Sequence, residues 1–212
     1  MIVLTTLFGY LIGSIPSGLV WVRLFTGQDV RSVGSGRTGG TNAMRAAGFW
    51  VGLLTALSDI GKGSIAVLVA RWFIPGAEAP WAMVLAGLAS IVGHNYPIWL
   101  RFKGGAGGAT CAGAALVFWP WLGPILIALG ALILYFIGYA SVATISVAIV
   151  TTIVFAVLAW VAMPGAFDPI YVLYGVGAII LLALALRPNF ERLMRGEERM
   201  VGRRAKKRPQ PA

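Results

Sequence analysis

Long apolar stretches recur along nearly the whole chain and constrain its fold more than any other sequence feature. They span residues 2–25, 51–74, 81–100, 109–118, 121–138, 140–163 and 169–186. A helix needs about 20 apolar residues to cross the hydrocarbon core of a bilayer. With 58% hydrophobic and only 11% charged residues, the chain also lies outside the composition of ordinary soluble domains. The sequence therefore predicts an all-α integral membrane protein with seven membrane helices.

Two of these stretches need separate treatment. The fourth, residues 109–118, is too short to cross a bilayer by itself, and Trp119-Pro120-Trp121 separates it from the fifth. We expect a short or broken fourth helix, which is tolerated where its backbone is buried in protein or lines a polar cavity. The first stretch is too long for the apolar part of a signal peptide and has no obvious cleavage pattern. We expect it to be retained as one helix.

The basic residues indicate how the chain is oriented. With the N-terminus outside, the connections at 26–50, 101–108 and 138–140 and the segment from Arg187 onward face the cytoplasm. Nearly all Lys and Arg residues then lie on or near the inner side, and Arg71 alone lies near the outer end. Cytoplasmic segments of membrane proteins carry an excess of Lys and Arg. The sequence therefore predicts an outer N-terminus and a cytoplasmic C-terminus.

The formal charge of +10 also raises the question of nucleic-acid binding. No aromatic and basic surface or nucleic-acid module accompanies the charge, so we expect no nucleic-acid partner and assign the charge to the positive-inside bias and to anionic lipid. The basic tail, residues 199–212, lacks the apolar content to fold. We expect one membrane domain over residues 1–198, followed by a disordered cytoplasmic tail that anionic lipids attract.

Two glycine-rich segments lie on the predicted cytoplasmic side. Residues 34–42, GSGRTGGTN, combine glycines with hydroxyl groups and Arg37, and Arg45 follows. Glycine lets backbone N–H groups converge on an anion, and a guanidinium grips phosphate at two points. The segment is either a phosphate cradle or a flexible interfacial loop, because Gly and Thr are also common in turns.

The second glycine-rich segment, Lys103 to Thr110, leads directly into an apolar stretch. Free N–H groups and the positive dipole end of a helix N-terminus favour anion binding, whereas small residues also permit close helix packing. The segment is no Walker A loop, because no Lys follows its last Gly. Two such loops on one membrane face favour a phosphate-handling function.

The remaining candidate groups are few. His94 is the only histidine and the one imidazole available for proton transfer, although a lone histidine at a helix end is often structural. Asp59 and Lys62, three residues apart, share a helix face and predict an ion pair, with support of a site as the alternative. Acidic residues are scattered and Cys111 is the only cysteine. We therefore expect no metal site, no disulfide and no cofactor.

Seven motifs follow one another along nearly the whole chain: GSIPSG at 13–18, DVRSVGSG at 29–36, GTN at 40–42, DIGKG at 59–63, GHNYP at 93–97, FKGG at 102–105 and NFERLMRGEE at 189–198. In this order they resemble the membrane-embedded acyl-phosphate:glycerol-3-phosphate acyltransferases, the bacterial PlsY family. The resemblance implies a seven-helix enzyme of the bacterial cytoplasmic membrane with its active site facing the cytoplasm. It implies transfer of an acyl group from acyl phosphate to the 1-hydroxyl of glycerol 3-phosphate, with no obligate protein partner.

The resemblance also implies the site. By position, the catalytic residues are Ser35, Arg45, His94, Lys103, Ser141 and Asn189, and the substrate-binding residues are Thr41, Asn42, Gly104, Gly105, Gly107 and Glu198. The segment around Arg45 is expected to hold glycerol 3-phosphate, and Lys103 with its glycines to hold acyl phosphate. The attacking hydroxyl loses its proton either to His94 or to a substrate phosphate.

The chain departs from the family pattern at four positions. Arg37 stands where the pattern has Asn, Gly40 where it has Ala, Ala106 where it has a second Lys, and Leu186 where it has His. We hypothesise that Arg37 supplies the charge missing at Ala106. The departures leave a second class of function open, a diverged paralogue that binds or carries an anionic lipid or phosphate compound without acyl transfer.

Overall fold

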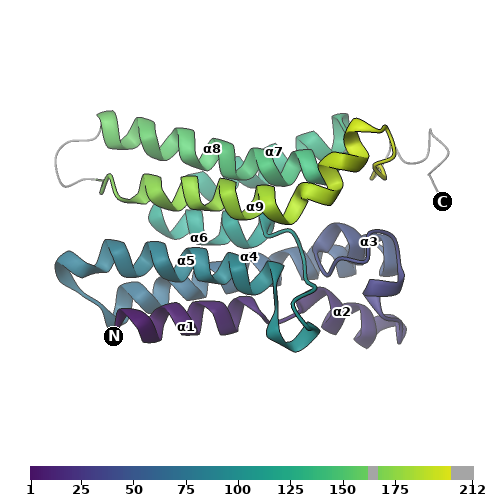
Figure 1. Cartoon of the computed structure of the whole chain (residues 1–212), viewed down its shortest axis with the longest axis horizontal. Helices are drawn as coiled ribbons and strands as arrows, with labels where there is room; N and C mark the ends of the chain where they lie inside the picture. Colours follow the sequence, from purple (N-terminus) through teal and green to yellow (C-terminus); the bar gives the residue numbers. More distant parts are fainter. Residues whose placement is uncertain (162–166, 202–212) are drawn as a thin grey trace.

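Helices make up most of the part of the chain that the computed structural model describes, residues 1–161 and 167–201 (Figure 1). They are α1 (Ile2–Gly13), α2 (Ser17–Thr26), α3 (Gly40–Ala47), α4 (Phe49–Phe73), α5 (Ala79–Asn95), α6 (Gly108–Phe118), α7 (Leu122–Phe136), α8 (Ala140–Val161) and α9 (Tyr171–Met194). Five segments in the described ranges are long and apolar enough to cross a membrane, and α6 and α7 are shorter apolar helices. The predicted all-helical membrane fold is confirmed.

The first apolar stretch is not one helix, and that prediction was wrong. Helix α1 ends at Gly13 and α2 begins at Ser17. Proline lacks an N–H group and disfavours the α conformation of the residue before it, so Pro16 interrupts the helix. The carbonyl oxygen of Ile15 accepts a hydrogen bond of 3.0 Å from Lys62 Nζ of α4. The same carbonyl also accepts from the N–H of Ser17, at 3.0 Å, so the buried charge of Lys62 adds a second bond at the break inside an apolar segment.

The short fourth membrane helix that the sequence predicts is present as α6, whose 11 residues end at Phe118 before Trp119 and Pro120. It packs very closely against α4. A Cβ atom added at Gly63 of α4 would lie 2.2 Å from the carbonyl oxygen of Thr110, and one at Gly113 would lie 2.0 Å from that of Ile60. Small residues that let helix backbones approach are typical of membrane helix interfaces, so α6 is tightly held.

The helices form two groups around α6. Figure 1 shows α1, α4 and α5 together on one side of α6, and α7, α8 and α9 on the other. A cluster of aromatic rings joins α6 to the second group, with the ring of Phe118 5.7 Å from that of Phe155 and 4.9 Å from that of Tyr174. Helices α2 and α3 and the C-terminal part of α9 gather at one end of the molecule (Figure 1). The polar segments of the chain therefore meet at that end.

Candidate active site

A cavity of about 790 Å³ opens where these polar segments meet. Its polar end is lined by Ser35, Arg37, Thr41, Asn42, Arg45, His94, Ser141, Asn189, Arg192, Glu198 and Arg199. Apolar residues of α4, α7 and α8 line the rest of the cavity. One cavity therefore combines a cationic pocket with an apolar arm.

The loop before α3 is held in shape by Asn42, which is only 2% exposed. Its Nδ2 group donates to the carbonyl oxygens of Val30, Val33 and Arg37 at 2.9 to 3.0 Å, and its Oδ1 atom accepts from the N–H of Ser35 at 3.0 Å. These bonds engage both the amide and the carbonyl of the side chain. Asn42 therefore shapes the cradle around the cavity by binding the loop backbone.

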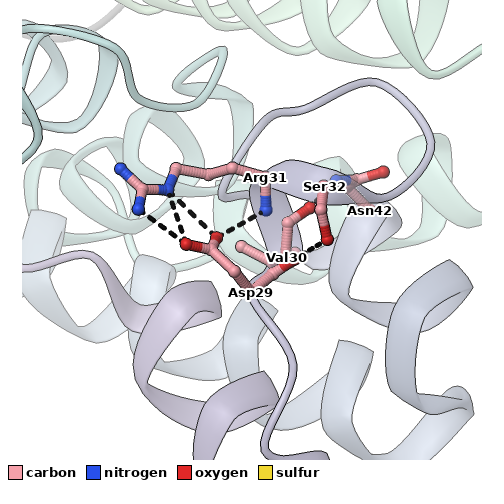
Figure 2. A network of polar contacts seen from close by, with 5 residues as sticks. All are labelled: Asp29, Val30, Arg31, Ser32 and Asn42. Atoms are coloured by element: carbon pink, nitrogen blue, oxygen red, sulfur yellow. Dashed lines mark hydrogen bonds and ion pairs between the residues drawn. The ribbon is translucent and has the colours of Figure 1, made fainter.

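Outside the cradle, a polar network fixes the short turn Val30–Ser32 (Figure 2). The carboxylate of Asp29 accepts hydrogen bonds from the backbone N–H of Arg31 at 2.8 Å and from its guanidinium at 2.6 to 3.1 Å. The side-chain hydrogen bond from Arg31 lowers the pKa of Asp29 below its ordinary value. The turn presents the carbonyl of Val30 to Asn42, so the network supports the cradle from the solvent side.

Arg45, on α3, points a weakly engaged guanidinium into the cavity. In the described part of the chain its hydrogen bonds reach the carbonyl oxygens of Arg199 and Met200 at 3.4 and 3.5 Å, which are long contacts. Burial, followed by repulsion from Arg199, lowers the pKa of Arg45 below its ordinary value, and attraction to Glu198 opposes this. Arg45 is a half-buried cation with donors to offer a ligand.

Arg37, by contrast, is firmly bound and joins three segments. Its guanidinium donates to the carbonyl oxygen of Gly105 at 2.8 Å, to Asn189 Oδ1 at 2.8 Å and to the carbonyl oxygen of Ala185. Burial, followed by repulsion from Arg192, lowers the pKa of Arg37 below its ordinary value. The cation expected to replace the charge missing at Ala106 therefore lies directly against that loop.

A carboxylate lies between two of the predicted catalytic residues. Ser141 Oγ donates to Glu198 Oε2 at 2.7 Å, and Asn189 Nδ2 donates to Glu198 Oε1 at 3.0 Å. All three side chains are buried. The structure therefore brings Ser141 to Asn189 and Glu198, from which it is distant in the sequence.

The segment that carries Glu198 closes over this region. The N–H of Val201 donates to the carbonyl of Gly138 at 2.8 Å, and Arg199 donates to the carbonyl of Gly34. Arg199 to Val201 were assigned to the basic tail, yet they pack on the membrane domain. The rest of that tail, 202–212, lies outside the described residues, so its disorder stays a prediction.

A buried triad of charged and polar groups lies behind the polar end. Lys62 Nζ is 2.9 Å from Asp59 Oδ1, and the side chains are 5% and 1% exposed. The predicted ion pair is confirmed. His94 Nδ1 also approaches Asp59 Oδ1, at 3.5 Å, and both residues line the cavity. The pair therefore hides two charges and also supports a residue of the site.

The second glycine-rich loop meets the cavity through its later residues. Ala106 to Ala109 line the cavity, whereas Lys103 is solvent-exposed at the start of the loop. The N–H of Gly104 donates to the carbonyl of Asn95 at 3.1 Å, and that of Gly105 to the carbonyl of His94 at 2.9 Å. These two N–H groups bind the end of α5. The N-terminus of α6, after a left-handed Gly107 with φ of 81°, faces the cavity instead.

Sequence reasoning missed two cations of the pocket. Arg192 lines the cavity three residues after Asn189, a spacing that places both on one face of α9 and that could have identified it. Arg199 is the first residue of the predicted tail, and nothing in its local sequence distinguishes it from the basic residues that follow.

Comparisons with known proteins agree with this arrangement. A family model described as glycerol-3-phosphate acyltransferase matches residues 3–196. Glycerol-3-phosphate acyltransferases of Anaeromyxobacter sp. (strain Fw109-5) and Pseudomonas aeruginosa (strain LESB58) are 40% and 38% identical to the chain, over 91% and 94% of its length and 93% and 99% of their own.

Two crystal structures of PlsY, an integral membrane glycerol 3-phosphate acyltransferase, are similar to the whole molecule. The glycerol 3-phosphate form has a TM-score of 0.81 and 32% identity, covering 95% of this chain and 96% of that one. The lysophosphatidic acid form has a TM-score of 0.77 and 29% identity, covering 95% of each chain. The match of the family model and of these relatives over nearly the full length confirms that the chain belongs to the glycerol-3-phosphate acyltransferase family.

Proposed function

We propose that the chain transfers a fatty acyl group from acyl phosphate to the 1-hydroxyl of glycerol 3-phosphate, producing lysophosphatidate and phosphate for phospholipid synthesis. One observation carries the proposal: a single cavity joins a cationic end to an apolar arm. The cationic end suits the phosphate groups of both substrates, and the apolar arm suits an acyl chain. Relatives crystallised in glycerol 3-phosphate and lysophosphatidic acid forms support the same pair of substrate and product.

In this proposal the cradle before α3 holds glycerol 3-phosphate. Arg45 and the hydroxyl groups of Ser35 and Thr41 line the cavity and bind the phosphate, while Asn42 keeps the loop in shape. Guanidinium and hydroxyl groups are suitable donors to phosphate oxygens. Ser141 and Asn189, positioned by Glu198, complete the pocket across from Arg45.

The acyl phosphate is proposed to lie against the second glycine-rich loop. Ala106 to Ala109 and the N-terminus of α6 support this placement, because unpaired N–H groups of a first helical turn bind anions. Gly104 and Gly105 contribute by fixing the loop to α5, and Gly107 by its left-handed turn into α6. Lys103 is exposed at the start of the loop, and in this proposal it attracts the incoming phosphate.

The reaction then requires alignment rather than a covalent enzyme intermediate. The 1-hydroxyl oxygen attacks the carbonyl carbon of acyl phosphate, a new C–O bond forms, and the C–O bond to phosphate breaks. The phosphate leaves with the electron pair, and the hydroxyl proton passes to a phosphate oxygen or to His94. Holding two reactants in contact and stabilising developing negative charge supply most of such an acceleration, and Arg37 and Arg45 provide fixed positive charge.

The same proposal includes the orientation of the protein in the membrane. The chain makes seven helical passes, of which α1 and α2 together form the first, so its two termini lie on opposite sides of the membrane, with the N-terminus outside. The polar end of the cavity and the C-terminus then face the cytoplasm. The concentration of Lys and Arg in the segments around α2, α3 and the end of α9 supports this orientation. The basic residues after Arg199 would contact anionic lipids.

The proposed reaction is tested with purified protein, palmitoyl phosphate and glycerol 3-phosphate in lipid. We expect inorganic phosphate and lysophosphatidate to appear in equal amounts, the second identified by mass spectrometry. Palmitate in place of palmitoyl phosphate is the control and should give neither product, because it has no phosphate leaving group. Binding or transport of the substrates without phosphate release would contradict the proposal and favour the carrier.

Arg37 provides a second test within this reaction. Replacement of Arg37 by Asn removes a cation and three hydrogen bonds that join the cradle to the Gly105 loop and α9. Hydrogen bonds to charged groups contribute about 1.5–3 kcal/mol each, so we expect kcat/KM to fall by at least about tenfold. Arg37→Lys, which keeps the charge but not the forked geometry, should recover only part of the activity. Unchanged kinetics of Arg37→Asn would refute a compensating role.

A further inference from the structure

The apolar arm of the cavity has two facing walls. Phe49, Leu53, Ala56 and Ile60 of α4 form one wall, and Leu126, Ile127, Gly130, Ala131 and Leu134 of α7 form the other. Ala112 of α6 and Ala143, Thr144 and Val147 of α8 also line the cavity. Successive turns of α4 and α7 therefore line the arm from the polar end inward.

Position along α7 corresponds to depth in this arm. Leu134 lies near the C-terminal end of α7, which leads to Ser141. Leu126 lies about two turns closer to the N-terminal end of the helix. At a rise of 1.5 Å per residue, these two residues are separated by roughly 12 Å along the axis. Gly130 lies midway between them. Gly130, together with its neighbour Ala131, therefore lines the middle of the arm.

Gly130 leaves this middle part open. Among the residues that the structure describes, no heavy atom would lie within 4 Å of a Cβ atom added at Gly130. In the interior of an α-helix, glycine costs roughly 0.5–1 kcal/mol of stability relative to alanine. No close helix contact explains the glycine, in contrast to Gly63 or Gly113. What the missing side chain provides is space inside the cavity.

We infer that Gly130 determines which acyl chains the enzyme accepts, by leaving the middle of the arm open to the distal part of a long chain. The inference rests on the proposed acyl transfer. A side chain at this position would occupy the space that the chain needs, so long acyl chains would lose burial while short ones would fit above it. Each methylene that loses burial weakens binding by about fourfold.

The test compares Gly130→Leu with the unmodified enzyme on palmitoyl phosphate and octanoyl phosphate. We expect the ratio of kcat/KM for palmitoyl to octanoyl donor to fall by at least about tenfold, with the KM for glycerol 3-phosphate unchanged. Gly61→Leu is the matched control. Gly61 also has no heavy atom within 4 Å of an added Cβ, but it does not line the cavity, so its ratio should stay unchanged.

Each outcome decides a separate point. An unmodified enzyme that forms no lysophosphatidate refutes the proposed function itself. An active enzyme whose donor ratio is unchanged by Gly130→Leu, or changed equally by Gly61→Leu, refutes the role of Gly130 alone. If Gly130→Leu does not fold, Gly130→Ala decides. Its ratio should fall by about fourfold if the space is used, and an unchanged ratio overturns the inference.

Discussion

Replacement of Arg45 by alanine is expected to reduce kcat/KM for glycerol 3-phosphate by at least about a hundredfold. The guanidinium lines the cavity, and its contacts with the carbonyl oxygens of Arg199 and Met200 are long, at 3.4 and 3.5 Å. Its donors are thus available to a phosphate. Two charge-assisted hydrogen bonds of about 1.5–3 kcal/mol each correspond to a loss of this size.

The measurement is steady-state kinetics with glycerol 3-phosphate varied at a saturating concentration of palmitoyl phosphate. Arg45→Lys should retain part of the activity, because an ammonium keeps the charge but cannot bind phosphate in the bidentate geometry of a guanidinium. Arg187→Ala is the control, since this arginine is 82% exposed and pairs with Glu191 along α9. A kcat/KM of Arg45→Ala close to that of Arg187→Ala would contradict the assignment.

The helices were largely predictable from the sequence, because a continuous apolar stretch of about 20 residues can pair all its backbone groups within a bilayer by forming a helix. The break between α1 and α2 was not predicted, although its signal, Pro16, is present in the sequence. Hydropathy averages over a whole stretch, so it does not detect that Pro16 lacks a backbone N–H group. The carbonyl that satisfies Lys62 at the break belongs to Ile15, and that contact arises only when α4 packs beside it.

The sequence predicted which segments form the site, but not which groups the individual side chains of those segments bind. The sequence placed two glycine-rich loops on one face, and the structure brings both to one cavity. Asn42 instead binds the backbone of its own loop, and Lys103 is solvent-exposed and does not line the cavity. The direction of a side chain in a loop depends on the backbone acceptors around it, and those acceptors come from segments that are distant in the chain. Arg37, bound to the carbonyls of Gly105 and Ala185, illustrates this dependence.

Replacement of Asp59 by leucine is expected to destabilise the fold by about 3–5 kcal/mol, the range typical of breaking a buried ion pair. Asp59 is 1% exposed and Lys62 5%, so removal of the carboxylate leaves an uncompensated charge in an apolar segment. The measurement is reversible unfolding in mixed micelles. Asp29→Leu is the control. The side chains of Asp29 and Arg31 are 38% and 43% exposed, and an exposed ion pair of this kind contributes about 1 kcal/mol or less.

A double variant distinguishes the two roles of the triad. Asp59→Leu with Lys62→Met removes both charges, and replacement of a whole buried pair by apolar residues is often neutral. We expect stability to recover in this variant to within about 1 kcal/mol, apart from the lost bond to Ile15. Activity should stay reduced, because His94 would still lack its carboxylate 3.5 Å away. Full recovery of activity together with stability would show that the pair serves the fold alone, and that His94 needs no orientation from Asp59.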